Sequence, residues 1–156
     1  MSTATTLTLA IIKPHVLKNP FALNAIKQII EENNFAIRIQ KKIQIDQKLA
    51  EKFYGEHKGR FFYKRLISFM CSSPSEVLVL ERVDAINKWR ELLGPTKVFK
   101  AVYSHPDSIR ALYGLSDTRN ACHGSDSLDS ALKEIRIFFP TFNCNGIESN
   151  NKTNYN

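Results

Sequence analysis

The chain has 156 residues, 43% of them hydrophobic, which is enough for one domain with a buried core. No stretch approaches 18 consecutive apolar residues, which excludes a transmembrane helix, and the first ten residues lack the basic and apolar pattern of a secretory signal or transit peptide. A net charge of +7 indicates anionic partners such as nucleotides or nucleic acid. Three cysteines without C-x-x-C spacing predict reduced thiols inside the cell, in the cytoplasm or alternatively the mitochondrion.

The first half of the chain alternates between patterns typical of strands and of helices. Residues 6–12 become continuously apolar, as a buried strand does, and residues 21–33 carry apolar side chains on one helical face. Residues 35–40 alternate between apolar and polar, which predicts a half-buried strand. A short helix beginning at residue 46 or 47 and ending at residue 54, and a second helical segment over residues 62–70, follow.

The second half continues the alternation with one interruption. Residues 77–80 predict a central strand, and residues 84–93 predict a helix capped by its first residue and ended by the Gly-Pro pair that follows. Residues 96–117 show no sustained period, so we expect a long loop with at most a short helix near residues 107–112. Residues 119–123 predict a short strand, and residues 128–139 a strongly amphipathic helix stopped by proline.

This order of elements predicts the fold class. Helices between strands favour an α/β sandwich, and the simplest layout is one helical layer on an antiparallel sheet of about four strands. We expect one domain over residues 1–140. Residues 141–156 are rich in asparagine and have too little apolar surface to order themselves, so we expect a disordered tail.

His123 carries the strongest functional signal. It lies where a strand turns, Gly124 behind it leaves room for a ligand, and the helix that follows can hold negative charge at its N-terminus. A neutral imidazole, with an ordinary pKa of about 6.5, is a fair nucleophile toward phosphorus near neutral pH. Glu134, in the third turn of that helix, could accept the proton of the other ring nitrogen and so fix the tautomer. A purely structural histidine remains the alternative.

Two polar residues beside His123 could take part in the same chemistry. Asn120 and Ser125 could orient or bond incoming groups. Ser125 as a nucleophile with His123 as its base is disfavoured, because no G-x-S-x-G motif is present. Ser125 and Asp126 could instead cap the following helix, and both roles can hold at once.

Phosphate binding would need cations, since the sequence has no G-x-x-x-x-G-K-[ST] motif. Lys13, Arg90 and Arg110 lie at the ends of predicted elements and together could neutralise a triphosphate, or each could be a solvated surface charge. Phe62 could stack on a base or belong to the core, and Thr96 could bond a phosphate oxygen or cap the loop. No cluster with metal-ligand spacing appears, so Mg²⁺ is expected to arrive on the nucleotide phosphates.

These residues resemble those of the nucleoside diphosphate kinases. Residues 119–127 are similar to that family's active-site signature, and further matches occur in the same order at residues 12–14, 60–62, 89–96 and 108–110. The resemblance implies a ferredoxin-like βαββαβ fold with extra short helices, usually in a hexamer. It also implies ping-pong transfer of the terminal phosphate of ATP to a nucleoside diphosphate through a phosphohistidine.

The resemblance also implies a role for each matching residue. His123 is similar to the phosphorylated nucleophile and Glu134 to the carboxylate that holds it, while Tyr54 and Ser125 resemble its supports. Phe62 resembles the base-stacking ring, and the residues that resemble phosphate and sugar contacts are Lys13, Arg90, Thr96, Arg110 and Asn120. His15 in place of an aspartate, a longer loop before Arg110 and Ala111 in place of glycine resemble the type 6 branch of the family.

Three functions remain open on the sequence. A nucleoside diphosphate kinase is the leading hypothesis, with nucleoside tri- and diphosphates as partners, a possible homo-oligomer and no membrane partner. The main alternative is a nucleotide-binding regulatory subunit with little turnover, suggested by the altered loop and His15. A nucleic-acid-binding protein is disfavoured, because no basic helix face with interleaved aromatic residues is present.

Overall fold

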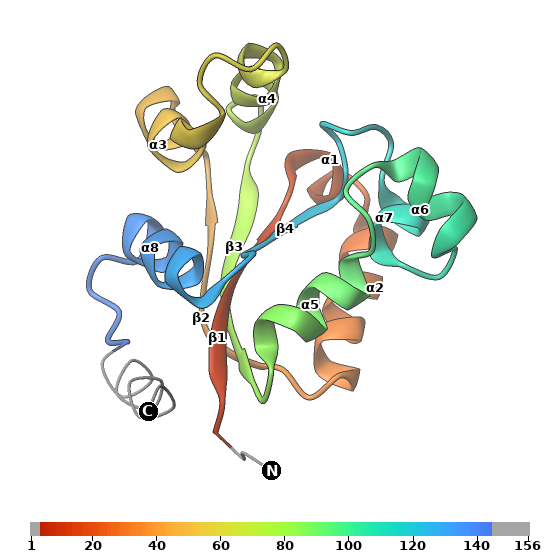
Figure 1. The fold of residues 1–156 in the computed structure, drawn as a ribbon, viewed down its shortest axis with the longest axis vertical. Coiled ribbons are helices and arrows are strands. Elements are labelled where there is room, and N and C mark those ends of the chain that lie inside the picture. Colours follow the sequence, from red (N-terminus) through yellow and green to blue (C-terminus); the bar gives the residue numbers. More distant parts are fainter. Residues whose placement is uncertain (1–3, 145–156) are drawn as a thin grey trace, which may run out of the picture.

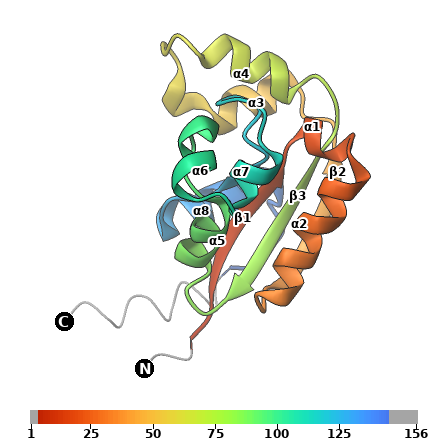
Figure 2. The ribbon, with the colours of Figure 1, turned by 90° about the vertical axis from the view of Figure 1, so that its right-hand side faces the viewer.

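The computed structural model describes residues 4–144 and contains a four-stranded antiparallel sheet in the order β2-β3-β1-β4 (Figures 1 and 2). The strands are β1 (Thr6–Ile12), β2 (Ala36–Ile43), β3 (Ser75–Arg82) and β4 (Cys122–Gly124). β1 lies in the middle and pairs with β3 on one side and β4 on the other. The predicted four-stranded antiparallel sheet of the α+β class is therefore confirmed.

Helices cover both faces of the sheet, whereas the sequence predicted a single helical layer. Both faces of β1 are buried, and each packs into a separate apolar cluster: Leu7, Leu9 and Ile11 lie in one, Ala10 and Ile12 in the other. The first cluster includes residues of α3 (Gln47–Phe53), α4 (Tyr63–Met70) and α8 (Leu128–Phe138). The second includes residues of α1 (Pro14–Leu17), α2 (Pro20–Glu32) and α5 (Ala85–Leu93).

The loop predicted over residues 96–117 is wrong in its first half, which contains an unpredicted helix, whereas the short helix expected near residues 107–112 is present. The two helices are α6 (Val98–Ser104) and α7 (Ile109–Tyr113). In α6 only Val98 and Ala101 are buried, and the exposed Phe99, Val102 and Tyr103 obscure the apolar period from which a helix is predicted. Together α6 and α7 form a lobe beside the end of β4 (Figure 1).

Smaller differences follow from tertiary contacts. The sequence did not predict α1, which begins directly after β1 with proline at its first position. β2 was expected to be half-buried, but it is an edge strand, and Ile37 and Ile39 are 41% and 37% exposed. β4 begins at Cys122, because the three residues before it form a turn. Asp84 precedes α5 in a left-handed conformation, and its side chain accepts a hydrogen bond from Asn87 Nδ2 rather than capping the helix backbone.

The packed part of the chain continues past residue 140, where the sequence placed the domain boundary. Cys144 is buried, and Phe142 packs against the cluster that includes α8. The tail predicted to be disordered lies, from residue 145 onward, outside the described residues. Within residues 4–144, no helix has the length and apolar character needed to cross a membrane.

Candidate active site

A strained turn leads into β4. The carbonyl oxygen of Asn120 accepts a hydrogen bond from the amide of Cys122 at 3.1 Å, which closes a three-residue turn around Ala121. Ala121 has φ of 76°, a left-handed conformation that costs a residue with a side chain about 1–2 kcal/mol. The amide of Lys13 donates to Ala121 O at 2.9 Å and ties this turn to the end of β1. The strain therefore lies immediately before the histidine that the sequence singled out.

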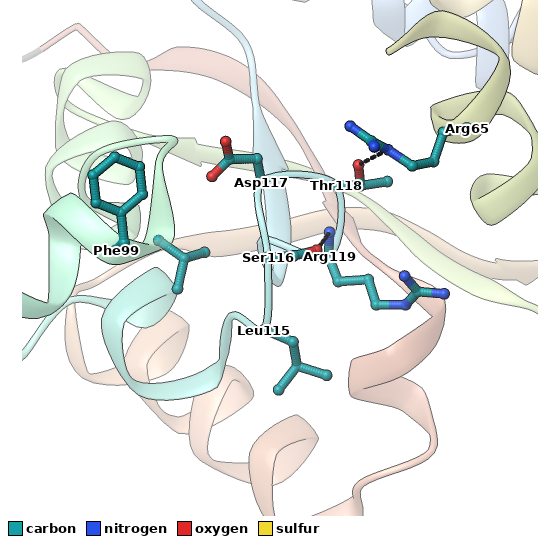
Figure 3. A pocket seen from close by; sticks show the side chains of 8 residues that line it. Arg65, Phe99, Leu115, Ser116, Asp117, Thr118 and Arg119 are labelled. Carbon is teal, nitrogen blue, oxygen red and sulfur yellow. Dashed lines mark hydrogen bonds between the residues drawn. The ribbon is translucent and has the colours of Figure 1, made fainter.

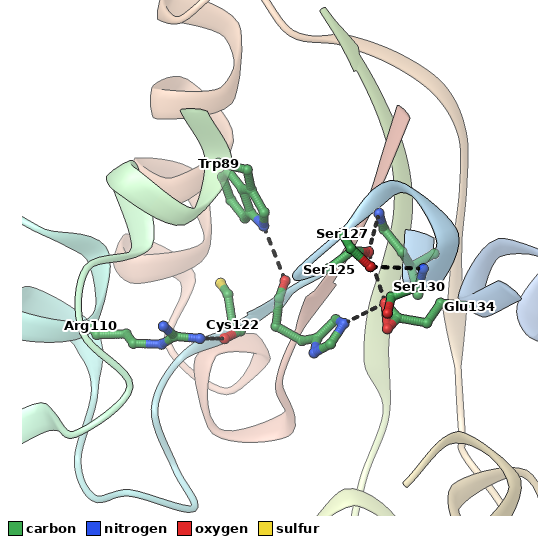
Figure 4. A network of polar contacts seen from close by, with 9 residues as sticks. Trp89, Arg110, Cys122, Ser125, Ser127, Ser130 and Glu134 are labelled. Carbon is green, nitrogen blue, oxygen red and sulfur yellow. Dashed lines mark hydrogen bonds and ion pairs between the residues drawn. The ribbon is translucent and has the colours of Figure 1, made fainter. Parts of the chain in front are cut away.

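Trp89 of α5 holds the backbone of His123 from behind. Its Nε1 donates to the carbonyl oxygen of His123 at 3.0 Å (Figure 4). A Cβ atom at position 124 would lie 2.7 Å from Trp89 Cδ1 and 3.0 Å from Leu93 Cδ1, so this position needs glycine for close packing. No motif in the sequence indicated this role for Trp89, although its position on one helical face with Ala85 and Leu93 indicates that its side chain is buried.

The side chain of His123 contacts Glu134, as the sequence predicted. Nε2 lies 2.8 Å from Glu134 Oε1, and Ser125 Oγ donates to the same oxygen at 2.8 Å. Ser125 Oγ in turn accepts a hydrogen bond from the amide of Leu9 at 3.1 Å, so β1 fixes the group. With a proton on Nε2 directed at the carboxylate, Nδ1 carries the free lone pair.

Ser125 does not cap α8, which corrects one of its two predicted roles. The N-cap is Ser127, whose hydroxyl accepts from the amide of Ser130 at 3.2 Å. Figure 4 shows Trp89 and Arg110 on one side of β4 and Glu134 on the other. His123 of β4 therefore lies between α5, which holds its backbone through Trp89, and α8, which holds its ring through Glu134.

Two cations, the buried Lys13 and the partly buried Arg110, lie beside the turn. Lys13 is 5% exposed, and its Nζ donates to the carbonyl oxygen of Thr118 at 3.3 Å. Burial, and then the nearby charge of Arg110, lower the pKa of Lys13 to about 7. Arg110 donates to Gly94 O at 2.8 Å and to Cys122 O at 3.0 Å, and burial lowers the pKa of its guanidinium. Burial also lowers the pKa of His15 to about 4, so that ring adds no charge at neutral pH.

Among the buried polar atoms that lack a hydrogen-bond partner, three belong to residues that were predicted for the site. They are the hydroxyl of Tyr54, Oδ1 of Asn120 and Nε of Arg110. Burial, and then the charge of Glu134, raise the pKa of Tyr54, so its hydroxyl stays protonated. An unpaired buried polar group costs about 1–3 kcal/mol, and a polar ligand that reached these atoms would remove that cost.

Two cavities open near these groups. One, of about 420 Å³, is lined by His123, Glu134 and Tyr54 and lies between the end of α3 and α8. The other, of about 580 Å³, lies between α4 and the lobe of α6 and α7, and Figure 3 shows Arg65, Phe99 and Asp117 around it. Both volumes suit a small organic ligand.

Thr118 links the second cavity to the buried lysine, a connection that sequence reasoning missed. Its hydroxyl accepts a hydrogen bond from Arg65 Nε at 3.3 Å, across the cavity, while its carbonyl oxygen accepts from Lys13. No sequence pattern indicated this, because one bond is to a backbone oxygen and the other spans 53 positions. The segment that covers Lys13 is therefore also tied to α4.

The remaining predicted site residues are less closely joined to His123. Arg90 is exposed on α5, and Thr96 is exposed between α5 and α6. Phe62 is half-buried at the start of α4, and its ring centroid lies 5.4 Å from that of His57. None of the contacts found within residues 4–144 joins these three side chains directly to His123.

Comparison with known proteins gives a consistent family. A family model described as nucleoside diphosphate kinase matches residues 6–144. The chain is 53% identical over 137 residues to nucleoside diphosphate kinase 6 of Danio rerio, covering 87% of this chain and 77% of the relative. It is 49% identical over 136 residues to the human protein of that name, covering 87% and 73%. A crystal structure of the Aquifex aeolicus nucleoside diphosphate kinase superposes with a TM-score of 0.83 at 38% identity, covering 87% of this chain and 96% of that one.

Proposed function

This chain belongs to the nucleoside diphosphate kinase family, and we propose that it transfers the terminal phosphate of a nucleoside triphosphate to a nucleoside diphosphate through His123. The observation that supports this most is the contact of His123 Nε2 with Glu134 at 2.8 Å. It assigns one ring nitrogen to the carboxylate and leaves Nδ1 as the nucleophile. The second support comes from the buried Lys13, the partly buried Arg110 and the unpaired polar atoms of the predicted site residues.

The proposed reaction has two steps that use one site. The lone pair of Nδ1 attacks the terminal phosphorus of the triphosphate, and the bond to the bridging oxygen breaks, so the diphosphate leaves with that electron pair. A second diphosphate then attacks the phosphorus on the ring with a terminal phosphate oxygen, and Nδ1 regains its lone pair. Glu134 stabilises the positive ring between the steps. Positioning and electrostatics supply most of the rate in phosphoryl transfer.

The cations and polar side chains around the ring are proposed to hold the phosphates and sugar. Lys13, Arg110 and Asn120 have the buried polar groups nearest the turn, and the hydroxyl of Tyr54 is available as a donor. The exposed members of the proposed nucleotide site are Arg90, Thr96 and the half-buried ring of Phe62. These would contact the nucleotide only once it is bound, with Phe62 against the face of the base.

We also propose that Mg²⁺ enters with the nucleotide. Members of this family generally use a divalent cation. Within the described part of the chain, no group of three or more His, Cys, Asp or Glu side chains could hold a metal ion. Mg²⁺ bound through phosphate oxygens and water would reduce the negative charge of the phosphates, and Lys13 and Arg110 would face the remaining charge.

Replacing Glu134 with glutamine should lower turnover by about 10²–10⁴-fold without unfolding the protein. The amide can donate to Nε2, which favours the tautomer with the proton on Nδ1 and removes the nucleophilic lone pair. Steady-state turnover with ATP and GDP measures the loss. Glu31→Gln is the matched control, because Glu31 is exposed on α2 and lies outside the cavity lined by His123 and Glu134. Equal loss in both variants, or none in Glu134→Gln, would contradict the tautomer argument.

Nucleotide binding should take up a proton above pH 7. The pKa of Lys13 is about 7 in the free protein, and bound phosphates raise it, because they favour the charged ammonium. Affinity should therefore fall by up to about tenfold per pH unit as the pH rises through 7. Calorimetry in two buffers of different ionisation enthalpy counts the protons taken up. Lys13→Met provides the baseline for the nucleotide's own phosphates, and an equal proton count in it and the wild type would refute the role of Lys13.

Turnover with ATP and GDP separates the proposed enzyme from its rival, a nucleotide-binding regulatory subunit. One structural feature supports the regulatory subunit. Arg65 and Thr118 are hydrogen-bonded across the second cavity, and this contact holds in place the segment that covers the buried Lys13. The kinase predicts that labelled phosphate moves from ATP to GDP with many turnovers per protein molecule. Nucleotide binding measured by calorimetry, combined with no more than background transfer, would favour the regulatory subunit.

We propose that copies of the chain associate through β2. This edge strand presents eight residues, Ala36–Ile43, with free backbone groups along one side and Ile37 and Ile39 exposed. Such an edge is a template for pairing with another strand. Light scattering coupled to gel filtration should give a mass above the 17.8 kDa of one chain, and Ile39→Lys should shift it toward one chain. A monomeric wild type would contradict this.

A further inference from the structure

The connection between α3 and α4 forms a projecting, exposed tip. All seven residues from 55 to 61 are exposed, and Phe61 is 92% exposed, although a large apolar side chain is normally buried. In both views the helices α3 and α4 lie at the end of the molecule away from the start of β1 (Figures 1 and 2). Phe61 contacts the ring of Phe62 edge-on at 5.6 Å, so its outer face is left to solvent.

Positive charge surrounds this phenylalanine. Residues 58–65 read K-G-R-F-F-Y-K-R and contain no acidic residue. Arg65 is directed to Thr118, whereas Lys58, Arg60 and Lys64 are exposed around Phe61. We call Lys58, Arg60, Phe61 and Lys64 the cationic tip. The nearest acid before it along the chain, Glu56, lies 4.0 Å from Lys133.

An apolar groove of about 620 Å³ adjoins the cationic tip, between α3 and α4. Its apolar lining comes from Tyr63, Ile67 and Cys71, and Lys58 and Lys64 lie along the same groove. Gln47 and Glu51 of α3 also line it and are hydrogen-bonded to each other at 3.0 Å. The groove therefore offers apolar surface beside two lysines. This combination is complementary to an anionic phospholipid, which has apolar acyl chains beside a negatively charged phosphate.

We propose that the cationic tip and this groove dock the protein on a membrane surface that contains anionic phospholipids. Lys58, Arg60 and Lys64 would contact the phosphates, and Phe61 would enter the interface between head groups and acyl chains. Each basic residue near such a surface strengthens binding by roughly fivefold. Peripheral docking needs no spanning segment, so it is compatible with the absence of a membrane-spanning helix within residues 4–144.

Single-stranded nucleic acid fits this surface less well. Sequence-independent binding of a strand uses several exposed aromatic rings in succession along a positive groove. Here the tip is convex, one ring is fully exposed, and the following rings of Phe62 and Tyr63 are half-buried. The groove beside it has one aromatic ring, that of Tyr63, among its lining residues, and the rest of its apolar lining comes from Ile67 and Cys71.

Co-sedimentation of the full chain with vesicles tests the charge. Phosphatidylcholine vesicles with phosphatidylserine should bind the protein, and phosphatidylcholine alone should not. The variant with Lys58→Gln, Arg60→Gln and Lys64→Gln should bind roughly a hundredfold more weakly. The matched control carries Lys18→Gln, Lys97→Gln and Lys100→Gln, which remove the same charge from exposed positions away from the tip and should keep most of the affinity. Equal loss in the two variants would overturn the assignment of the tip.

Fluorescence tests the proposed insertion of position 61. The chain has one tryptophan, Trp89, which is fully buried, so Phe61→Trp adds a reporter with little background change. Its emission should shift to the blue and become protected from acrylamide with anionic vesicles only, and Phe61→Ser should weaken binding by about tenfold. No shift on bound vesicles would overturn insertion. Binding of a single-stranded oligonucleotide that depends on the same three cations, without vesicle binding, would replace the proposal with a nucleic-acid surface.

Discussion

Replacing His123 with alanine is expected to lower phosphate transfer from ATP to GDP by at least about 10³-fold, because the nucleophile that carries the phosphate is removed. The fold should survive, since the side chain is 22% exposed and the backbone bond from Trp89 to His123 O does not involve the ring. Steady-state transfer of labelled phosphate gives the rate, and circular dichroism confirms that the variant is folded.

The matched control is His105→Ala. His105 is exposed at the end of α6, and its ring contacts only the neighbouring Ser104 among the interactions found in residues 4–144. This variant should retain close to wild-type turnover. A His123→Ala variant that keeps more than about a tenth of wild-type transfer would show that another group carries the phosphate or that transfer is direct.

Replacing Trp89 with alanine is expected to produce the largest loss of stability, about 3–5 kcal/mol in the free energy of unfolding. Trp89 of α5 is fully buried against β4 and Phe35, whose ring centroid lies 6.0 Å from that of Trp89. The change leaves a cavity and also removes the donor to His123 O, so turnover should fall even where the variant remains folded. Urea unfolding followed by circular dichroism measures the first effect.

Two further variants separate the causes of that loss. Trp89→Phe keeps most of the packing and removes the hydrogen bond, so it should cost about 1–3 kcal/mol. Tyr103→Ala is the surface control, because this residue is 88% exposed and its loss should change stability by about 0.5 kcal/mol or less. If Trp89→Ala were no more destabilising than Tyr103→Ala, the packing role of Trp89 would be wrong.

The strength of the apolar period decided how well each element was predicted from sequence. β1 and α2 have uninterrupted patterns, and both were placed to within about a residue or two, the usual uncertainty at element ends. α6 was missed because Phe99, Val102 and Tyr103 are apolar but exposed, so the helix has no clear polar face. β2 has the alternating pattern of a half-buried strand. In the single chain, however, its apolar side chains remain partly exposed to solvent, because β2 is at the edge of the sheet.

The site was predictable where it depends on local spacing. His123 and Glu134 meet because the turn after β4 folds α8 back along the sheet, which brings the third turn of the helix to the ring. The hydrogen bonds from Trp89 to His123 O and from Lys13 to Thr118 O were not predictable. Both acceptors are backbone carbonyl oxygens, which every residue has, so no residue type marks these positions in the sequence. Ser127 caps α8 in place of the predicted Ser125. The hydroxyl of Ser125 is instead bonded to the amide of Leu9 and to Glu134.

The most direct test of the account is to follow one phosphate through the protein. Incubated with Mg²⁺ and ATP labelled in the terminal phosphate, the wild type should acquire label that is lost in acid, is stable in base and maps to His123. After the nucleotide is removed, added GDP should take the label and become labelled GTP. Label that is absent, that maps to another residue or that GDP fails to remove would contradict a phosphohistidine at this position.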